Sequence, residues 1–533
     1  MEHSHKRPRT PIWQPDQHPP KRRATHTNTQ ASLIKSPFQL TRIKDLPDDM
    51  NKDSVTLGDL LGDPLITECW NFNFMHDVNF IMKSFDRDTR NLVKLHIVHG
   101  YWKRDDPSRN MLEAAAKVYQ NISLHTAFMP EPFGTHHSKM IILFRNDDTA
   151  QVIIHTANTI EKDWANMTNG VWGSPILPLQ KDQEDEATQS EDSDWDEREK
   201  PKAETRTKTN PTKISPTAAG NDVGNQFKID LLNYLRAYDS RKVICRPLVE
   251  NLAKFDFSAV RARLVASVPG RHSANDPNST PWGWVALRKA LKDINTQDGE
   301  SLVVAQMSSI ATLGPKPTWL HDTLFKALGT SKTPKLTRPR FRVVFPTADE
   351  IRRSLGGYAS GASIHTKTQS AQQAKQLGYL KPIFCHWAND CPSGKDLDKS
   401  EIRNSGRNRA APHIKTYIRF GKHSIDWALL TSANLSKQAW GEATSADGKI
   451  RIASWEIGVL VWPALYGNDA LMVETFQTDT PDEPQGDGED NQTIVGLRMP
   501  YSLPLQCYGR NETPWVATLP HVEPDCLGQS WVI

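Results

Sequence analysis

The chain has 533 residues, of which 37% are hydrophobic, and its 16 Trp and 17 Phe exclude a wholly disordered protein. No run of about 18 apolar residues occurs, which excludes a membrane-spanning helix, so we expect no membrane partner. The net charge is +3, but two acidic stretches, residues 181–200 and 479–490, contribute much of the negative charge. The rest of the chain, called the basic body below, therefore has a clear surplus of Lys and Arg. A basic body favours a polyanionic partner such as nucleic acid.

The N-terminal region is rich in Pro, His, Thr and Arg and shows no hydrophobic periodicity, which predicts a disordered basic tail over residues 1–45. Two basic clusters in this tail, Lys6-Arg7 with Arg9 and Lys21-Arg22-Arg23, are spaced like a bipartite nuclear signal. They predict localisation in the nucleus; a merely solvated basic tail is the alternative.

The next part of the chain predicts a first α/β domain over residues 46–258. Residues 179–222 are acidic and then rich in Thr, Pro and Lys, which predicts a disordered insertion within this domain. Around it, short apolar runs predict strands, and an apolar face at helical spacing predicts helices. The strands are expected at 94–100, 139–144 and 151–158, and the helices near 110–120 and 227–238.

Strands alternating with helices then predict a second α/β domain over residues 259–533, with an acidic loop at about 474–491. The six cysteines are scattered and show no zinc-binding spacing, so we expect neither a metal nor another cofactor. The strands of this domain are expected at 262–270, 301–311 and 340–347, and its helices at 285–294 and 318–328.

An internal repeat is the strongest feature of the sequence. Each half carries H-x-K, then eighteen residues, then Asn, and Trp six residues later. Because four identities fall in the same register, we interpret the repeat as a duplication. Its members are His137, Lys139, Asn158 and Trp164 in the first half and His413, Lys415, Asn434 and Trp440 in the second.

If H-x-K lies on a strand, the alternation of side chains places His and Lys on one face, roughly 7 Å apart. A turn and a returning antiparallel strand would then bring Asn158 close to His137 and Asn434 close to His413. Two halves related by a pseudo-twofold axis would pool these groups in one site.

Such a site fits phosphoryl transfer. Lysine ammonium and asparagine amide groups can donate to phosphate oxygens, one histidine can attack phosphorus, and the other can protonate the leaving oxygen. Water would then hydrolyse the phosphohistidine, without a metal. A buried structural histidine is one alternative. Zinc binding by His136 and His137 is another, which is disfavoured because neighbouring side chains on a strand point to opposite faces.

The stretches FGTHHSKM, PHIKTY, TSANLSKQAWG and WEIGVLVWP resemble the phospholipase D superfamily, and specifically its tyrosyl-DNA phosphodiesterase (type 1) branch. Other members continue H-x-K with four residues and an Asp, where this chain has Phe144 and Phe420. The resemblance extends from about residue 60 to the C-terminus, apart from the acidic insertions. It implies two similar α/β/α-layered domains with mixed sheets, pseudo-twofold related and joined near residue 258, with the site at their interface.

The resemblance also implies roles for single residues. His137 would be the nucleophile, His413 the general acid and base, and Glu456 a support for a catalytic histidine. Asn169 stands where the family has Gln, and its shorter amide leaves that supporting role in question. The phosphate ligands would be Lys139, Asn158, Lys415 and Asn434, and the contacts to DNA would be Ser309, Thr312, Ser436, Phe133 and Phe74.

The implied activity is DNA repair by hydrolysis of the 3′-phosphotyrosyl bond between DNA and a topoisomerase I-derived peptide, leaving a 3′-phosphate. Other 3′ adducts are further substrates to expect. The partners would be DNA, preferably with single-stranded ends, and the peptide; a monomer is the default expectation. A phospholipase D-like phosphodiesterase or nuclease with another substrate, and a non-catalytic nucleic-acid scaffold, are the alternatives.

Overall fold

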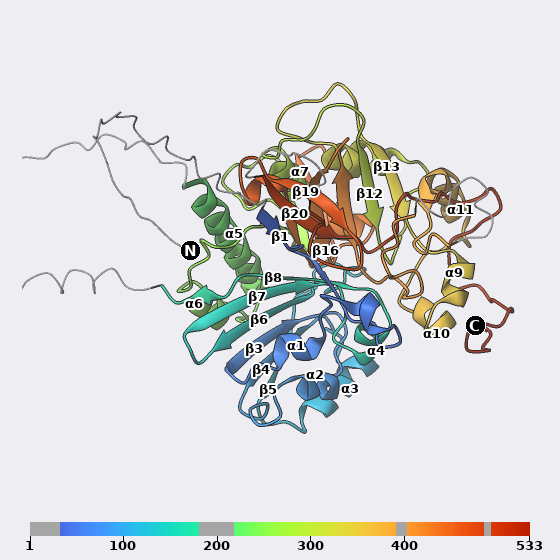
Figure 1. Ribbon diagram of the computed structural model, residues 1–533. Coiled ribbons are helices and arrows are strands. Elements are labelled where there is room, and N and C mark those ends of the chain that lie inside the picture. The colour runs from blue at the N-terminus through green and yellow to red at the C-terminus, as the bar shows by residue number, and fades with distance from the viewer. Residues whose placement is uncertain (1–31, 181–217, 391–401, 484–491, 533) are drawn as a thin grey trace, which may run out of the picture.

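The computed structural model describes residues 32–180, 218–390, 402–483 and 492–532, which form two mixed β-sheets covered by helices (Figure 1). The first sheet has the strand order β2-β8-β7-β6-β3-β4-β5, with β9 beside β7. Its strands are β2 (Gln39–Leu40), β3 (Ile66–Phe72), β4 (Lys94–His99), β5 (Ile122–Thr126), β6 (Met140–Arg145), β7 (Thr149–His155), β8 (Gly170–Gly173) and β9 (Leu177–Pro178).

The second sheet has the order β10-β18-β16-β15-β12-β13-β14. Step by step, its neighbouring strands have the same parallel or antiparallel sense as those of the first sheet. This agreement confirms the predicted fold class of two similar α/β units. The strands are β10 (Arg263–Ser267), β12 (Leu302–Gln306), β13 (Arg340–Val344), β14 (Phe384–Cys385), β15 (Thr416–Phe420), β16 (Ile425–Thr431) and β18 (Glu456–Val461).

Helices complete the layers. In the first half they are α1 (Leu57–Leu61), α2 (Val78–Ser84), α3 (Pro107–Ala116), α4 (Glu161–Ala165), α5 (Ala218–Ala237) and α6 (Arg246–Leu252). In the second half they are α7 (Gly283–Leu291), a π-helix η3 (Leu320–Phe325) continued by α8 (Lys326–Leu328), α9 (Ala348–Arg353), α10 (Gly357–Gly361), α11 (Ala371–Leu380) and α12 (Lys437–Trp440). In the described ranges, no helix combines the length and apolar character needed to cross a membrane.

Side-chain alternation gives the first sheet its two buried faces. Along β6, Ile141 and Leu143 join a core with α1, α2 and α3, whereas Met140, Ile142 and Phe144 join the larger core on the other face. Burying both faces explains why this strand reads as an unbroken apolar run.

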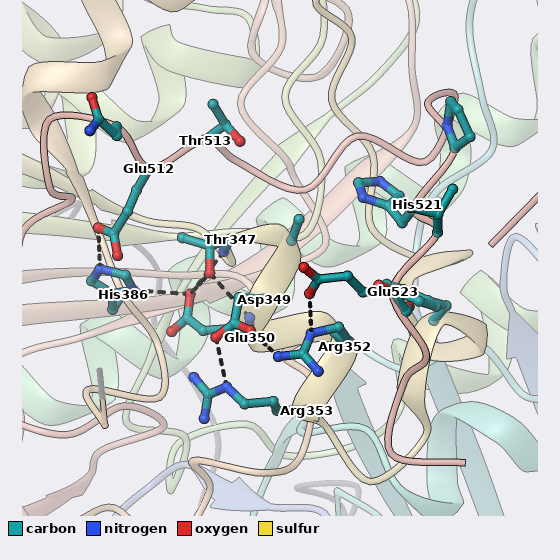
Figure 2. A pocket seen from close by; sticks show the side chains of 15 residues that line it. Thr347, Asp349, Glu350, Arg352, Arg353, His386, Glu512, Thr513, His521 and Glu523 are labelled. Atoms are coloured by element: carbon teal, nitrogen blue, oxygen red, sulfur yellow. Dashed lines mark hydrogen bonds and ion pairs between the residues drawn. The ribbon is translucent and has the colours of Figure 1, made fainter. Parts of the chain in front are cut away.

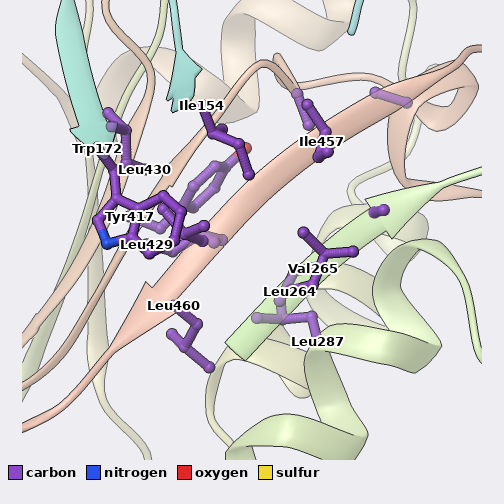
Figure 3. Packing of buried hydrophobic residues seen from close by; sticks show 14 of the residues in the cluster. Ile154, Trp172, Leu264, Val265, Leu287, Tyr417, Leu429, Leu430, Ile457 and Leu460 are labelled. Carbon is purple, nitrogen blue, oxygen red and sulfur yellow. The ribbon is translucent and has the colours of Figure 1, made fainter. Parts of the chain in front are cut away.

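The larger core is shared by the two sheets. Ile154 and Trp172 of β7 and β8 lie in it with Leu429, Leu430 and Ile457 of β16 and β18 (Figure 3). The two sheets therefore pack as one body around the point where β7 and β16 end.

Two small sheets complete the structure. One pairs β11 (Gly270–Ser273) with β17 (Lys449–Ile452). In the other, β1 (Ser32–Ile34) lies parallel to β20 (Thr493–Arg498), which pairs in turn with β19 (Leu471–Thr475). The start of the described chain is thus bound to a strand near its end.

The predicted extent of disorder is partly wrong. Residues 32–45, placed in the tail, contain β1 and β2, which are too short to give a periodic signal and are held by partners distant in sequence. Residues 218–222, placed in the insertion, begin α5. The predicted acidic loop overlaps β19 only at residues 474–475, and residues 476–483 form no helix or strand, as expected of a loop. The remainder of these predictions, residues 1–31, 181–217 and 484–491, lies outside the described residues.

Candidate active site

A cavity of about 380 Å³ lies at the junction of the two sheets. His137, Asn158, His413 and Asn434 line it, so the structure brings both halves of the repeat together. The H-x-K motif was predicted to lie on a strand. In the structure each motif instead ends directly before a strand, β6 or β15. The pairing nevertheless continues past the strand end, because His155 N donates to Lys139 O at 3.0 Å and Thr431 N to Lys415 O at 3.1 Å.

Each histidine is anchored by the opposite half of the molecule. His137 N donates to Trp455 O at 3.0 Å, and Trp455 directly precedes Glu456. His413 N donates to Thr168 O at 2.9 Å, and Thr168 directly precedes Asn169. The two halves therefore support each other: each half hydrogen-bonds to the backbone of the histidine that the other half supplies.

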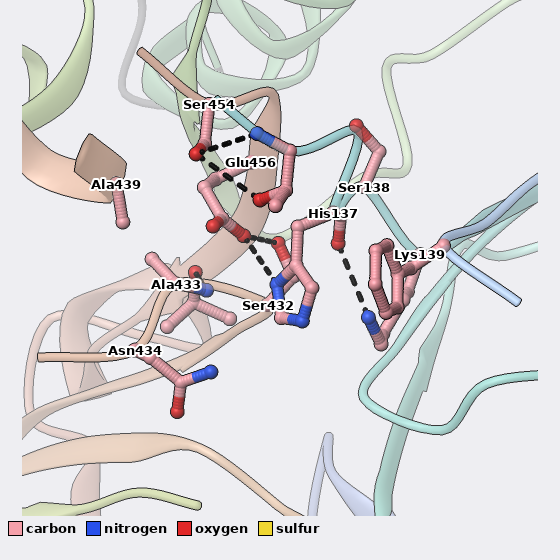
Figure 4. A network of polar contacts seen from close by, with 12 residues as sticks. His137, Ser138, Lys139, Ser432, Ala433, Asn434, Ala439, Ser454 and Glu456 are labelled. Atoms are coloured by element: carbon pink, nitrogen blue, oxygen red, sulfur yellow. Dashed lines mark hydrogen bonds and ion pairs between the residues drawn. The ribbon is translucent and has the colours of Figure 1, made fainter. Parts of the chain in front are cut away.

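The ring of His137 is oriented by a carboxylate. Glu456 Oε2 lies 2.9 Å from His137 Nδ1, and Ser432 Oγ donates to the same oxygen at 2.5 Å (Figure 4). An acceptor at Nδ1 places the ring proton there and leaves the lone pair on Nε2 for an electrophile. Burial lowers the pKa of His137 below its usual 6.5, although Glu456 opposes the shift.

The ring of His413 has two acceptors at Nδ1. Asn169 Oδ1 lies 3.2 Å away and Asp163 Oδ2 3.1 Å away. The shorter amide of Asn169 thus reaches the histidine directly, with Thr156 Oγ1 donating to its oxygen at 2.9 Å. Burial, reinforced by the Lys415 ammonium, lowers the pKa of His413 to about 3.

Asp163 was not predicted. Its carboxylate is fully buried and accepts from the backbone N of Asn158 at 2.7 Å and from Asn158 Nδ2 at 2.9 Å. Burial alone would raise the pKa of Asp163, but His413, Asn158 and Lys415 lower it to about 2. The repeat does not single out this residue, because all five residues between the repeated Asn and Trp differ between the two halves.

The two lysines are fully buried. Lys139 Nζ donates to His137 O at 3.3 Å, and Lys415 Nζ donates to His413 O. Burial lowers the pKa of Lys139 to about 8; burial and then the Lys139 charge lower the pKa of Lys415 well below 10.5. Two desolvated, mutually repelling cations would be stabilised by an anion bound between them.

The asparagines are also fixed. Asn434 Oδ1 accepts from the backbone N of Ser308 at 3.2 Å and of Ser309 at 2.8 Å, which leaves Nδ2 to donate to a ligand. Trp164, the last member of the first repeat, donates from Nε1 to Asn158 O at 3.0 Å. Trp164, which does not line the cavity, therefore fixes the backbone of Asn158, which does.

Four of the five predicted DNA contacts line the cavity: Ser309, Ser436, Phe74 and Phe133. Phe133 is 84% exposed, and the Phe74 ring centroid lies 5.7 Å from that of His137. Ser436 Oγ also accepts from Ala439 N at 3.0 Å and so caps α12. Thr312 is not among the lining residues, which include its neighbour Ala311.

The pairing of His136 argues against zinc at the adjacent histidines. Its ring nitrogens lie 3.0 Å from Asn73 O and 2.9 Å from the hydroxyl of Tyr238. The rings of His136 and His137 thus have separate partners, as the alternation of side chains predicts.

A second cavity, of about 430 Å³, lies between α9 and the C-terminal segment and contains none of the predicted site residues (Figure 2). Its charges pair with one another: Arg352 and Arg353 with Asp349, and His386 with Glu350. The charged side chains named here are paired with one another, and the described residues that line this cavity include no pair of His-Lys-Asn sets. The candidate active site is therefore the cavity between the sheets.

Two histidines, each held at Nδ1 and each accompanied by a buried lysine and an asparagine, lie together between duplicated α/β/α layers, an arrangement that fits phosphodiester chemistry. The chain belongs to the tyrosyl-DNA phosphodiesterase family, whose model matches residues 37–509. It is 31% identical over 552 residues to a probable tyrosyl-DNA phosphodiesterase of Schizosaccharomyces pombe, covering 96% of this chain and 98% of that one. It is 30% identical to tyrosyl-DNA phosphodiesterase 1 of Drosophila melanogaster, covering 87% and 70% of the two chains.

The fold also matches a solved structure. The crystal structure of the yeast tyrosyl-DNA phosphodiesterase superposes with a TM-score of 0.61 at 19% identity, covering 92% of this chain and all of that one. At this identity the match shows the shared fold. Together with the family match, it identifies the protein as a phosphodiesterase of the hydrolase class.

Proposed function

We propose that this protein hydrolyses the 3′-phosphotyrosyl bond between DNA and a topoisomerase I-derived peptide, leaving a 3′-phosphate, with other 3′ adducts as further substrates. The observation that carries the proposal is that the histidine and asparagine of each half line one cavity between the sheets, with each lysine buried beside its histidine. Relatives that match the chain over most of its length are named tyrosyl-DNA phosphodiesterases, which supports a phosphotyrosyl bond to DNA as the substrate. The proposed product is the starting point for repair of the broken strand.

In the first step, His137 Nε2 attacks phosphorus while the bond to the tyrosine oxygen breaks and His413 Nε2 donates a proton to that oxygen. The Glu456 contact at Nδ1 supports His137 as the nucleophile, because it holds the Nε2 lone pair available. In the second step, His413 accepts a proton from water, whose oxygen attacks phosphorus as the bond to His137 breaks.

His413 must be protonated for the first step, yet its pKa is low without substrate. A phosphodiester anion between Lys139 and Lys415 would offset the lysine charges that contribute to this low value. Asp163 and Asn169 would then stabilise the imidazolium at Nδ1. The two ammonium groups also supply positive charge to the transition state, so the proposed reaction needs no metal.

The test is a single-stranded oligonucleotide with a 3′-phosphotyrosine, incubated in EDTA with the parent protein, His137→Ala and His413→Ala. We expect tyrosine release by the parent, none by His137→Ala, and a covalent protein–DNA species accumulating with His413→Ala. His423→Ala, in the exposed turn after β15, is the matched control and should behave like the parent. Loss of parental activity in EDTA would refute the metal-free mechanism, and an unreactive parent with added metals would refute the substrate.

Two further properties belong to this proposal. We propose a preference for single-stranded ends, since Phe74 and Phe133 offer stacking surfaces at the cavity. A duplex substrate with a blunt adducted end should therefore be cleaved more slowly than a single strand.

We also propose that the protein is located in the nucleus. Ala substitution of Lys21, Arg22 and Arg23 should then move a fluorescent fusion protein out of the nucleus. We further propose that the protein is a monomer, so light scattering should give the mass of one chain.

A further inference from the structure

Two cysteines face each other at the edge of the second sheet. Cys385, at the end of β14, forms an antiparallel bridge with Cys507 of the C-terminal segment. Tyr508 N donates to Phe384 O at 3.1 Å and His386 N donates to Gln506 O at 2.9 Å. These flanking bonds make Cys385 and Cys507 a non-hydrogen-bonded pair, the type whose side chains lie closest together.

This pairing matches the geometry of a disulfide. Non-hydrogen-bonded partners have Cα atoms about 4.5 Å apart, within the range that disulfides span. The two Sγ atoms are 3.4 Å apart, and both cysteines are free. Side-chain rotation that brings them to about 2.05 Å would form the bond between the two facing segments.

The two thiols differ in access and acidity. Cys385 is fully buried, whereas Cys507 is exposed. The Cys385 thiol and the Arg342 guanidinium lower the pKa of Cys507, and the same contact with burial raises the pKa of Cys385. Cys507 is therefore the attacking thiol and Cys385 the resolving one.

Cys507 opens onto a basic cavity of about 610 Å³ that shares no lining residue with the active site. Arg340, Arg342, Arg403 and Lys422 line it, and among the described residues Glu300 is the one carboxylate that does. Such a cavity would concentrate small anions beside the thiol.

We propose that Cys507 and Cys385 form a reversible dithiol–disulfide site that reacts with small anionic disulfides, of which glutathione disulfide is the model. The Cys507 thiolate attacks one sulfur of glutathione disulfide, forming a mixed disulfide and releasing one glutathione thiolate. Cys385 then loses its proton and attacks the Cys507 sulfur, which releases the second glutathione. Two protein thiols are oxidised and one glutathione disulfide is reduced to two glutathione molecules.

The test is mass spectrometry of the reduced full-length protein after incubation with glutathione disulfide and acid quenching. We expect loss of two hydrogens and a crosslinked peptide pair containing Cys385 and Cys507. Cys385→Ser should stop at a glutathione adduct on Cys507, and Cys507→Ser should form neither the adduct nor the crosslink. Cys526→Ser removes another exposed thiol and should leave the crosslink unchanged.

Charge selection is tested with three disulfides: anionic glutathione disulfide, neutral hydroxyethyl disulfide and cationic cystamine, each normalised to its rate with a free thiol. We expect the first to react fastest, and Arg342→Gln to slow it roughly tenfold more than the neutral one. Equal normalised rates, or an oxidised protein without the Cys385–Cys507 crosslink, would overturn the proposal. If a variant fails to fold, differential alkylation of the parent before and after oxidation shows whether Cys385 and Cys507 are the two thiols that are lost. These readouts do not depend on phosphodiesterase activity.

Discussion

At the scale of single residues, the two histidines share a design but differ in their acceptors. His137 has one carboxylate at Nδ1, from Glu456, whereas His413 has an amide and a carboxylate, from Asn169 and Asp163. A carboxylate stabilises an imidazolium more than an amide does. In the proposed mechanism, Asp163 is therefore a positioning residue for His413, the histidine that carries a proton to the leaving group.

Asp163→Asn should lower kcat/KM for a phosphotyrosyl oligonucleotide roughly 10- to 100-fold, because a smaller fraction of His413 would be protonated and able to donate. The loss should be much smaller for a nitrophenyl leaving group, which departs without a proton. Parallel steady-state assays with both substrates check this, and Asp469→Asn, at an exposed position, is the control. Equal losses on both substrates would instead indicate a purely structural role.

Glu456→Gln should change the pH profile as well as the rate. Glu456 raises the pKa of His137 against the effect of burial, so removing its charge lowers that pKa further. In the proposed mechanism His137 attacks as the neutral imidazole, so activity is lost as pH falls through its pKa. The acid limb of kcat/KM, below pH 6.5 in the parent, should therefore move to lower pH in the variant. A limb that stays in place or moves to higher pH would contradict the assigned contact.

At the scale of elements, the segment before β6 is fastened to the second half by close backbone pairing. Trp455 N donates to Thr135 O at 2.9 Å, and Ser454 Oγ accepts from Thr135 N at 3.1 Å. The neighbouring Gly134 is required by space, since a Cβ there would lie 1.9 Å from Ala453 O.

Gly134→Ala should therefore push the two segments apart, displace His137 and reduce kcat/KM by roughly tenfold or more. The overpacking should also lower the free energy of unfolding by about 1–3 kcal/mol. Denaturant titration and kinetics measure both effects. Gly378→Ala in α11 is the matched control: its Cβ meets nothing within 4 Å, so it should stabilise by about 0.5–1 kcal/mol.

At the same scale, some features of the fold and of the candidate site could be predicted from the sequence and others could not. The matched spacing around His137 and His413 predicted the duplication, because a returning strand of fixed length fixes the register of Asn158 and Asn434. The same symmetry argument hid Asp163, which has no counterpart in the other half. β1 escaped prediction because its three residues are defined by β20, and no local pattern encodes a partner so distant.

At the scale of the whole molecule, the net charge of +3 includes two strongly acidic stretches, so the remaining body is distinctly basic. Contacts between basic residues and DNA phosphates release counterions and weaken with salt. KM for an adducted oligonucleotide should rise steeply with salt, whereas KM for a mononucleotide nitrophenyl ester should rise much less. Assays at several salt concentrations compare the two slopes, and equal slopes would argue against an extended phosphate-binding surface.

The exchange of supports between the halves has a consequence for biosynthesis. When the first half leaves the ribosome, His137 has been made but Trp455 and Glu456 have not, and β1 still lacks β20. A nascent or truncated chain therefore holds His137 without its backbone and carboxylate partners. The candidate site is complete only after translation has supplied both halves of the chain.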